Sequence, residues 1–352
     1  MKEAELRRCQ IHEWYPRFKP HTIKTLFHPL SDSFIRYLLG EPDPHSSADP
    51  PPFLLPRPSS GLDPLPRTTA GVDPTSSLSP VNSDSDSDDD RRSSAADDAP
   101  SFPDLEAAVT RSIADLGGAV LPKLNWSAPK DATWISADGS LRCTSFSEIA
   151  LLLRSSDSIA HDLSQALASC SDASPDPSSL PFYLALRKWY PSLRPEMEFR
   201  CFVRGRRLIA VSQREVTTFY PVLPDRKDEI LPLIERFFHE VVRERFGSEN
   251  YTIDVYLISD GRVKIVDFNP WGAFTLPLMF EWEELDEQGF GAQGVEFRVV
   301  EERQGVRPGL KTAVPYDYLD TGEGSGWDQF LKRADEEIRK QAEDIGNDSE
   351  GG

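Results

Sequence analysis

The stretch VKIVDFNPWG, from Val263 to Gly272, ends an apolar run with two oxygen-bearing side chains. Asp267 and Asn269 are two residues apart, so in a strand both project from one face while Phe268 projects from the other. Carboxylate and amide oxygens are ligands that Mg²⁺ takes alongside nucleotide phosphates. The residue types and their spacing therefore indicate a cation site where this strand ends.

A second carboxylate comes from the strand before it. Tyr251 to Ile258 and Arg262 to Phe268 are separated by a turn that contains Asp260-Gly261, a pair that favours a two-residue type I′ hairpin turn. Facing carboxylates repel unless a cation lies between them, which favours a metal site over the alternatives of a capping Asp, a solvated Asp or a register slipped by one. The register of such a turn sets four pairs opposite each other: Thr252 and Asn269, Asp254 and Asp267, Tyr256 and Ile265, Ile258 and Val263.

A metal that holds phosphates needs further cations for the remaining negative charge. The chain has no Gly-x-x-x-x-Gly-Lys-[Ser/Thr] loop, but a lysine borne on a strand can hold phosphates without one. Each candidate could instead be a surface cation, and Trp189, which offers a flat face for a base, could equally lie in the core. The basic candidates are Lys123, Lys130, Arg187, Lys188, Arg200 and Arg214.

The elements that would position these residues are mostly antiparallel strands with flanking helices. Apolar periodicity predicts helices over Leu105–Leu116 and Asp228–Gly247. Alternation predicts strands over Ala119–Leu121 and Phe182–Trp189, and a hairpin over Glu198–Glu215 that turns at Gly205. The pattern indicates the α+β class.

Composition divides the chain into four parts. We expect a folded N-terminal segment (1–40), a disordered Pro/Ser/Asp-rich insertion (41–100), a main domain (101–316) and an acidic C-terminal tail (317–352). Twelve of the 30 prolines lie between residues 42 and 100. Residues 82–98 and 317–352 carry net charges of −5 and −7, most of the total of −19, so the folded parts are only mildly acidic.

The totals exclude several classes of protein. A net charge of −19 argues against a nucleic-acid-binding surface, which needs clustered Lys and Arg. The four cysteines have no Cys-x-x-Cys spacing, so neither a zinc site nor a disulfide framework is indicated. The chain has no apolar run of the ~20 residues that cross a membrane, and no signal peptide is expected at its start. We therefore expect a reduced, cytoplasmic protein.

Several ordered motifs together resemble the cell division cycle protein 123 family of eukaryotes. The resemblance covers residues 8–40 and 102–285. Many relatives carry an acidic residue at the position where this chain has Leu276. This difference puts the resemblance of the following loop in doubt more than that of the metal site. The motifs are CQIHEWYPRF, TIK, LPKLNWSAPKDATWI, SSDSI, LALRKWYP, EFRCFV, VSQRE and VDFNPWG.

The resemblance implies an ATP-grasp-like fold, in which two α+β lobes of mainly antiparallel sheet clamp ATP with Mg²⁺. By motif, the first-lobe strand and the loop covering the phosphates supply Lys123, Ala128, Lys130 and Asp131. The segment that meets adenine and sugar supplies Arg187, Lys188 and Trp189, and Arg200 and Arg214 face the phosphates. Asp254, Asp267 and Asn269 match the metal ligands, which are the three residues that the hairpin register indicates.

The implied function is assembly of eukaryotic translation initiation factor 2. An ATP-binding chaperone of this kind binds the gamma subunit and promotes its joining to the alpha and beta subunits, which supports translation initiation and cell division. We expect a monomer that binds neither nucleic acid nor membrane. The alternatives are an ATP-grasp carboxylate–amine ligase acting through an acyl phosphate, and a protein whose nucleotide is only structural.

Overall fold

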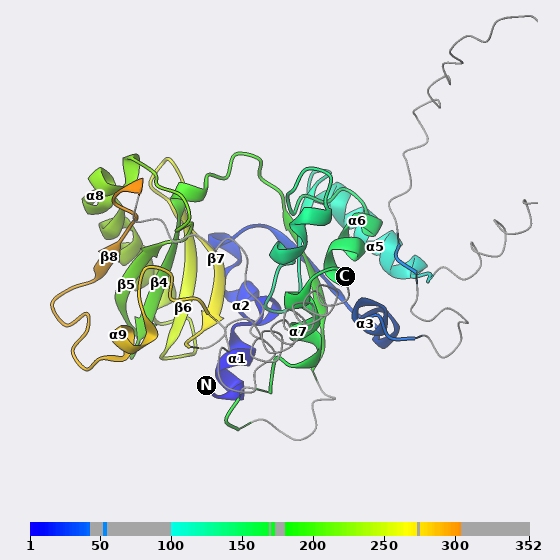
Figure 1. Cartoon of the computed structure of the whole chain (residues 1–352), viewed down its shortest axis with the longest axis horizontal. Helices are drawn as coiled ribbons and strands as arrows, with labels where there is room; N and C mark the ends of the chain where they lie inside the picture. The colour runs from blue at the N-terminus through cyan, green and yellow to red at the C-terminus, as the bar shows by residue number, and fades with distance from the viewer. Residues whose placement is uncertain (43–51, 55–99, 169, 173–179, 273–274, 304–352) are drawn as a thin grey trace, which may run out of the picture.

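The computed structural model describes residues 1–42, 52–54, 100–168, 170–172, 180–272 and 275–303. These form two lobes, each built on its own sheet, with the N-terminal helices α1 and α2 between them (Figure 1). Most of the expected disordered insertion and the whole acidic tail lie outside the described residues, so for those residues the two assignments stay predictions. Residues 52–54 of the expected insertion are an exception, because Leu54 packs against the first-lobe core and its N–H donates to the hydroxyl of Tyr37 at 3.0 Å. Within the described part of the chain, no helix is long and apolar enough to span a membrane.

The first lobe contains a three-stranded antiparallel sheet in the order β1-β3-β2. Its strands are β1 (Thr25–Pro29), β2 (Val120–Lys123) and β3 (Tyr183–Lys188). Four helices bury their apolar faces against the sheet face that carries Leu184 and Leu186. The helices are α3 (Asp32–Leu39), α5 (Pro103–Asp115), α6 (Phe146–Arg154) and α7 (Asp157–Ser164).

Serine side chains cap the N-termini of three of these helices. Ser31, Ser145 and Ser156 each accept a hydrogen bond from the backbone N–H three residues later, which satisfies a donor that the helix itself leaves free. Gly40 ends α3 with a φ of 71°, a conformation that glycine adopts without steric cost.

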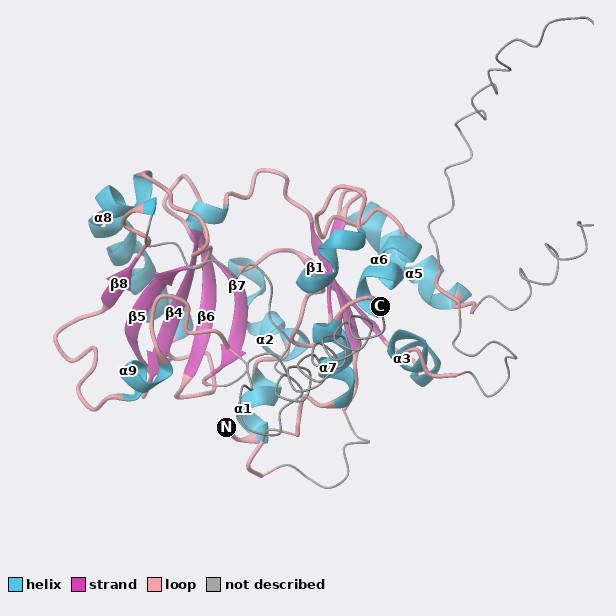
Figure 2. Cartoon of the chain, viewed as in Figure 1, coloured by secondary structure: helices cyan, strands magenta, loops and turns pink. Residues whose placement is uncertain are grey.

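The second lobe contains a five-stranded sheet in the order β7-β6-β4-β5-β8 (Figure 2). Its neighbouring strands are antiparallel except for β8, which runs parallel to β5. The helix α8 (Val222–Phe237) continues as a π-helical turn, η4 (Phe238–Val242), and α9 (Trp282–Asp286) follows β7. The strands are β4 (Glu198–Arg204), β5 (Arg207–Gln213), β6 (Tyr251–Leu257), β7 (Val263–Pro270) and β8 (Glu296–Arg298).

The N-terminal segment contributes to both lobes. It forms α1 (Glu3–Arg8), α2 (Ile11–Phe18) and the short 3-10 helix η1 (Lys19–His21), and β1 then joins the first sheet. Trp14 and Phe18 pack against Phe268 of β7, with ring centroids 5.3 and 5.2 Å apart. Helix α2 also contacts β3, so it fills the space between the two sheets.

The turn between β6 and β7 differs from the prediction. Ile258 and Arg262 pair around a three-residue loop, and of Asp260 and Gly261 only Gly261 has a positive φ, 84°. The predicted two-residue type I′ turn, which needs positive φ at both positions, is therefore wrong. Near the turn the register is shifted by one, so that Ile265 faces Val255 and not Tyr256.

A β-bulge restores the predicted pairing further along. Val266 has no partner in the ladder, and beyond it Asp254 faces Asp267 and Thr252 faces Asn269. The bulge keeps Ile265 and Phe268 buried while the carboxylates keep their positions, because an extra residue in one strand offsets the extra residue in the turn. The predicted placement of the two carboxylates is confirmed, although the turn from which it was derived is not.

Candidate functional site

Two cations of the first sheet face the second lobe. Lys123 at the end of β2 pairs with Ala185, and Arg187 lies two residues further along β3, so both cations are on the same face of the sheet. Leu184 and Leu186 project from the other face into the helical core. This alternation aims Lys123 and Arg187 at β7.

Lys123 forms an ion pair with one of the two facing carboxylates. Its Nζ lies 2.7 Å from Oδ2 of Asp267 and also donates to the carbonyl oxygen of Trp126. Lys123 is only 3 % exposed. The other oxygen of Asp267, Oδ1, is buried and has no hydrogen-bond partner among the described residues. A buried carboxylate oxygen without a partner is unfavourable, so this atom fits a bound cation.

The other facing carboxylate, Asp254, is buried among guanidinium groups. Arg200 donates to both of its oxygens, at 2.7 and 2.8 Å, and Nε of Arg214 lies 3.4 Å from Oδ2. Burial alone would raise the pKa of Asp254, but Arg200, with Arg214 and Lys130, holds that pKa well below its usual range. Asp254 is therefore ionised. The amide of Asn269 lies 3.5 Å from the same Oδ2.

The two carboxylates and the Asn269 amide form an oxygen-rich donor set of the kind that Mg²⁺ takes. In the described part of the chain, no group of three His, Cys, Asp or Glu side chains gathers as a metal site. A cation here would complete its coordination with phosphate oxygens and water, as Mg²⁺ does in nucleotide sites. The residues present fit such a cation, with Oδ1 of Asp267 the oxygen already open to it.

Arg187 is a buried cation with few partners. It is 5 % exposed. Among the described residues its side chain makes a single, long hydrogen bond of 3.4 Å to Oγ1 of Thr22, and its Nε has no partner. Burial lowers the pKa of the guanidinium, while Asp267 and Glu198 oppose this shift. An anion bound beside Arg187 would supply the missing hydrogen bonds.

Lys130 is another cation of the first lobe that interacts with charged side chains of the second lobe. Lys130 begins the short helix η2 (Lys130–Ile135). Its side chain is exposed, and the charge of Arg214 lowers its pKa, while Glu198 and Asp254 raise it. These interactions join the charged side chains of both lobes into one group. This interlobe charge cluster contains Lys123, Lys130, Arg187, Glu198, Arg200, Arg214, Asp254 and Asp267.

Five cations and three carboxylates give the interlobe charge cluster two net positive charges. Such an excess favours a polyanion, and a polyphosphate carrying a divalent cation matches both the cations and the facing carboxylates. Glu198 is the member that sequence reasoning missed. It lies two residues before Arg200 on β4, so the period of two that grouped Asp267 with Asn269 could have found it.

The other predicted residues lie around the cluster. Ala128 packs against the first-lobe core, and its carbonyl accepts the N–H of Lys130 at 2.7 Å. The carboxylate of Asp131 accepts from Ser156 and Ser158 at the start of α7, which fastens the loop that carries Lys130. The structure therefore gives Asp131 a local structural role, and its assignment to the nucleotide stays a prediction.

Lys188 and Trp189 end β3 beyond Arg187. Lys188 is on the opposite face of the strand from Arg187, with its ammonium 5.6 Å from the centre of the Tyr190 ring. The backbone N–H of Trp189 donates to Ala119 at 3.1 Å. The structure does not bring these two side chains into the interlobe charge cluster, so their contact with a base and sugar stays a prediction.

A buried carboxylate stands behind Lys123. Asp162 of α7 is 5 % exposed and accepts both the N–H and the hydroxyl of Ser127, at 2.7 and 2.9 Å. Burial raises its pKa to about 6, although the Ser127 hydrogen bonds and the charge of Lys123 act in the opposite direction. No sequence pattern indicates this residue, because its burial depends on how α7 packs.

The raised pKa predicts a pH-dependent stability. The folded protein holds the Asp162 proton up to about pH 6, whereas the unfolded chain releases it near pH 3.8, so the stabilisation is complete below 3.8 and is lost as the pH rises through 6. About two pKa units correspond to roughly 3 kcal/mol. The free energies of unfolding of the wild type and of Asp162→Asn are measured in urea at several pH values. The value for the wild type minus that for the variant should fall by roughly 3 kcal/mol between pH 4 and 7. A constant difference would contradict the prediction.

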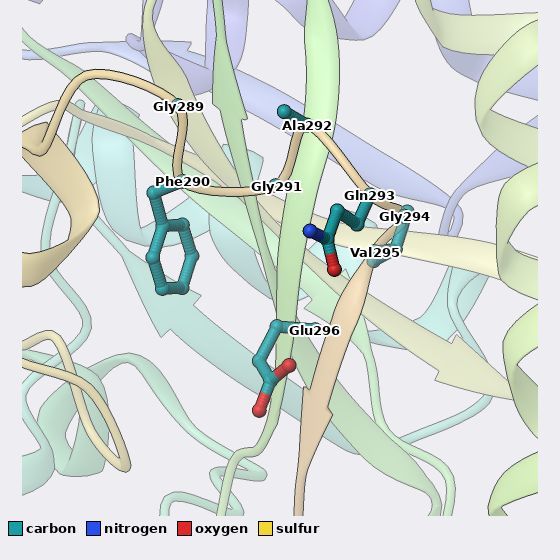
Figure 3. Close-up of a pocket in the computed structure, with 8 residues that line it drawn as sticks. All are labelled: Gly289, Phe290, Gly291, Ala292, Gln293, Gly294, Val295 and Glu296. Carbon is teal, nitrogen blue, oxygen red and sulfur yellow. The ribbon is translucent and has the colours of Figure 1, made fainter.

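A hollow of about 410 Å³ lies elsewhere, at the β8 edge of the second sheet and away from β7 (Figure 3). One loop, Gly289 to Glu296, lines it. Residues 289–294 have Gly-x-Gly-x-x-Gly spacing, which was not recognised from the sequence. The loop leads into strand β8 and not into a helix, so it is not the dinucleotide-binding motif.

Comparisons with known proteins agree with the motifs. The family model D123 matches residues 14–322. The "Translation initiation factor eIF2 assembly protein" of Xenopus laevis is 36 % identical over 335 residues, which cover 92 % of this chain and 93 % of that protein. The protein of the same name from Danio rerio is 37 % identical over 339 residues, with coverages of 92 and 91 %.

A solved structure shows the same fold. Cdc123 from Schizosaccharomyces pombe superposes with a TM-score of 0.65 at 29 % sequence identity, over 86 % of this chain and 99 % of that one. This match and the two lobes of mainly antiparallel sheet confirm the expected fold class. The chain belongs to the D123 family, the cell division cycle protein 123 family that its motifs resemble.

Proposed function

We propose that this chain is an ATP- and Mg²⁺-binding assembly factor for eukaryotic translation initiation factor 2. The names of its relatives support the assembly role. The observation that carries nucleotide binding is the pair of facing carboxylates, Asp254 and Asp267, set among five cations from two lobes. The factor binds the gamma subunit and promotes its joining to the alpha and beta subunits.

Each part of the interlobe charge cluster has a task in this proposal. When bound, Mg²⁺ neutralises phosphate charge and supplies the cation that the two carboxylates lack. Arg187 receives an anion that completes its hydrogen bonds, and Lys123 and Lys130 carry charge from the first lobe to the phosphates. Because cations of both lobes contact the same ligand, its binding fixes the orientation of one lobe relative to the other. This orientation forms the surface that binds the gamma subunit.

Calorimetry and capture experiments test the two halves of this proposal separately. MgATP should bind the purified chain, and ATP with EDTA should bind much more weakly, because the carboxylates then repel the phosphates. Isolated gamma subunit should be retained by the immobilised chain, and more strongly with MgATP than without it. Equal binding of ATP with and without Mg²⁺ would contradict the metal site, and failure to retain the gamma subunit would contradict the partner.

Two further properties belong to the proposal. We expect a monomer, which light scattering of the purified chain would check, and a cytoplasmic location, which fractionation of cells would check. The ligase alternative is not favoured by the relatives, which are assembly proteins by name. It predicts ADP release with a suitable acid and amine and a ligated product in stoichiometric amount, whereas an assembly factor releases no such product with the initiation-factor subunits.

Deleting residues 43–98 should leave MgATP binding within about twofold of the wild type. The composition of this segment predicts that most of it lies outside a packed core. Among its described residues, Leu54 packs against the first-lobe core and the carbonyl of Pro52 accepts a hydrogen bond from Arg154, so a small loss of stability is expected. Calorimetry measures the affinity and thermal unfolding measures the stability. Loss of folding in the shortened chain would show that the insertion is part of the folded structure.

A further inference from the structure

One peptide unit links a buried carboxylate to the ammonium of Lys123. The N–H of Ser127 donates to Oδ2 of Asp162 at 2.7 Å, and the carbonyl of Trp126, in the same peptide, accepts from Nζ of Lys123. A trans peptide is planar, with its N–H and C=O pointing in opposite directions. An acceptor that holds the N–H at one end therefore fixes where the carbonyl points at the other.

The rest of the turn fixes the same peptide. Both oxygens of Asp162 are used by Ser127, since the hydroxyl donates to Oδ1 at 2.9 Å. The N–H of Leu124 closes the turn by donating to the carbonyl of Ser127 at 2.8 Å. The indole N–H of Trp126 donates to the carbonyl of Leu6 at 2.9 Å, which ties the turn to α1. Asp162 supplies the one full charge among these contacts.

The charge of Asp162 also strengthens the far end of the peptide. A carboxylate that accepts an N–H polarises the peptide and increases the negative charge on its carbonyl oxygen. That oxygen then binds the ammonium of Lys123 more strongly than a peptide with a neutral partner would. The ammonium lies between this carbonyl and Oδ2 of Asp267, so its position depends on both.

We propose that Asp162 is a positioning residue that acts through the Trp126–Ser127 peptide to aim the Lys123 ammonium at Asp267 and at the phosphates of the ligand. The phosphate part rests on the proposed function, whereas the contact with Asp267 is present without any nucleotide. Asp162 touches neither ligand nor metal in this proposal. It acts indirectly, because it holds the peptide whose carbonyl contacts Lys123 at the end of β2.

The test compares Asp162→Asn with Asp138→Asn. Asp138 has matching hydrogen bonds, from the N–H and hydroxyl of Ser140 at 3.0 and 2.8 Å. It is exposed, however, and among the described residues no lysine donates to the carbonyl of the Gly139–Ser140 peptide. Two readouts are taken: the rate at which acetic anhydride acetylates Lys123 without nucleotide, measured by mass spectrometry against the other lysines, and MgATP affinity measured by calorimetry.

Asp162→Asn should raise the relative acetylation rate of Lys123 severalfold, because the ammonium is held less firmly between its two oxygen partners. MgATP affinity should fall about tenfold, as is usual when a residue that orients a ligand group is changed. Asp138→Asn should change neither readout. Ser127→Ala, which keeps the backbone N–H bond, should have a smaller effect than Asp162→Asn on both.

The outcomes separate this inference from the proposed function. An unchanged rate for Lys123 in folded Asp162→Asn overturns the positioning role, and so does an equal rise at all lysines, which indicates general loosening. A specific rise at Lys123 in a chain that binds no MgATP supports the positioning and contradicts the nucleotide function. If Asp162→Asn does not fold, nuclear magnetic resonance of the wild type decides. The Ser127 amide and the Lys123 ε-methylene signals should then shift with one common pH midpoint, and different midpoints overturn the proposal.

Discussion

Asp267→Ala is expected to abolish measurable MgATP binding while the chain stays folded. Within the described part of the chain, the substitution removes the one carboxylate that has a buried oxygen without a hydrogen-bond partner, and it relieves the repulsion between facing carboxylates. Changing a residue that merely orients a metal ligand typically costs 10–100-fold in affinity, so loss of the ligand itself should cost more than about 100-fold. Calorimetry measures the affinity and thermal unfolding checks the fold.

Two further variants sharpen this experiment. Asp267→Asn keeps a hydrogen-bond acceptor for Lys123, which is buried and would otherwise lose its carboxylate, so it separates loss of the metal ligand from loss of the ion pair. Asp260→Ala removes an exposed carboxylate from the turn of the same hairpin, where it pairs with Arg262, and should bind MgATP like the wild type. Unchanged affinity in Asp267→Ala would show that the metal site is wrongly assigned.

The hairpin shows what the sequence could predict. Alternation along β7 placed Asp267 and Asn269 on one face and Phe268 in the core, because side-chain direction in a strand depends only on the period of two. The turn type was wrong, and the bulge at Val266 was not predicted, because a three-residue loop and a two-residue loop have similar sequence preferences around Asp-Gly. The facing carboxylates are nevertheless where the sequence placed them.

The contacts between the two lobes could not be predicted from the sequence. Lys123 and Asp267 are 144 residues apart, and their contact depends on how α2 and η1 hold the two sheets against each other. Thr22, which follows η1, donates to the carbonyl of Ile265 at 2.7 Å and accepts from Arg187, so a residue outside every predicted site joins both lobes beside the cluster. Composition and periodicity carry no information on such packing. The same limit hid Asp162, whose role depends on the turn against which α7 lies.

Asp254 has a structural role in addition to its proposed role as a metal ligand. Arg200 holds both of its oxygens and also donates to the carbonyl of Leu276 at 2.8 Å, which fastens the chain beyond β7 to the sheet. Leu276, where an acidic side chain was expected, therefore contributes to the site through its backbone carbonyl. A backbone contact tolerates a change of side chain, which explains how the departure can occur without disturbing the ligands.

Arg200→Met is expected to lower the free energy of unfolding by about 3 kcal/mol, since removing one partner of a buried ion pair leaves the other charged and poorly solvated. Arg214, 3.4 Å from Asp254, compensates only in part. Urea unfolding measures the loss. Arg194→Met, which breaks the exposed pair with Glu196, is the matched control and should change stability by less than about 1 kcal/mol.

The double variant Arg200→Met, Asp254→Leu separates the two roles of Asp254. Replacing both members of a buried pair with apolar residues removes the unpaired charge, so stability should recover to within about 1 kcal/mol of the wild type. MgATP affinity should be lower than in Arg200→Met alone, because the metal ligand is then absent as well. Recovered stability with the same affinity as Arg200→Met would show that Asp254 serves the fold alone, whereas recovered stability with a further loss of affinity assigns it both roles.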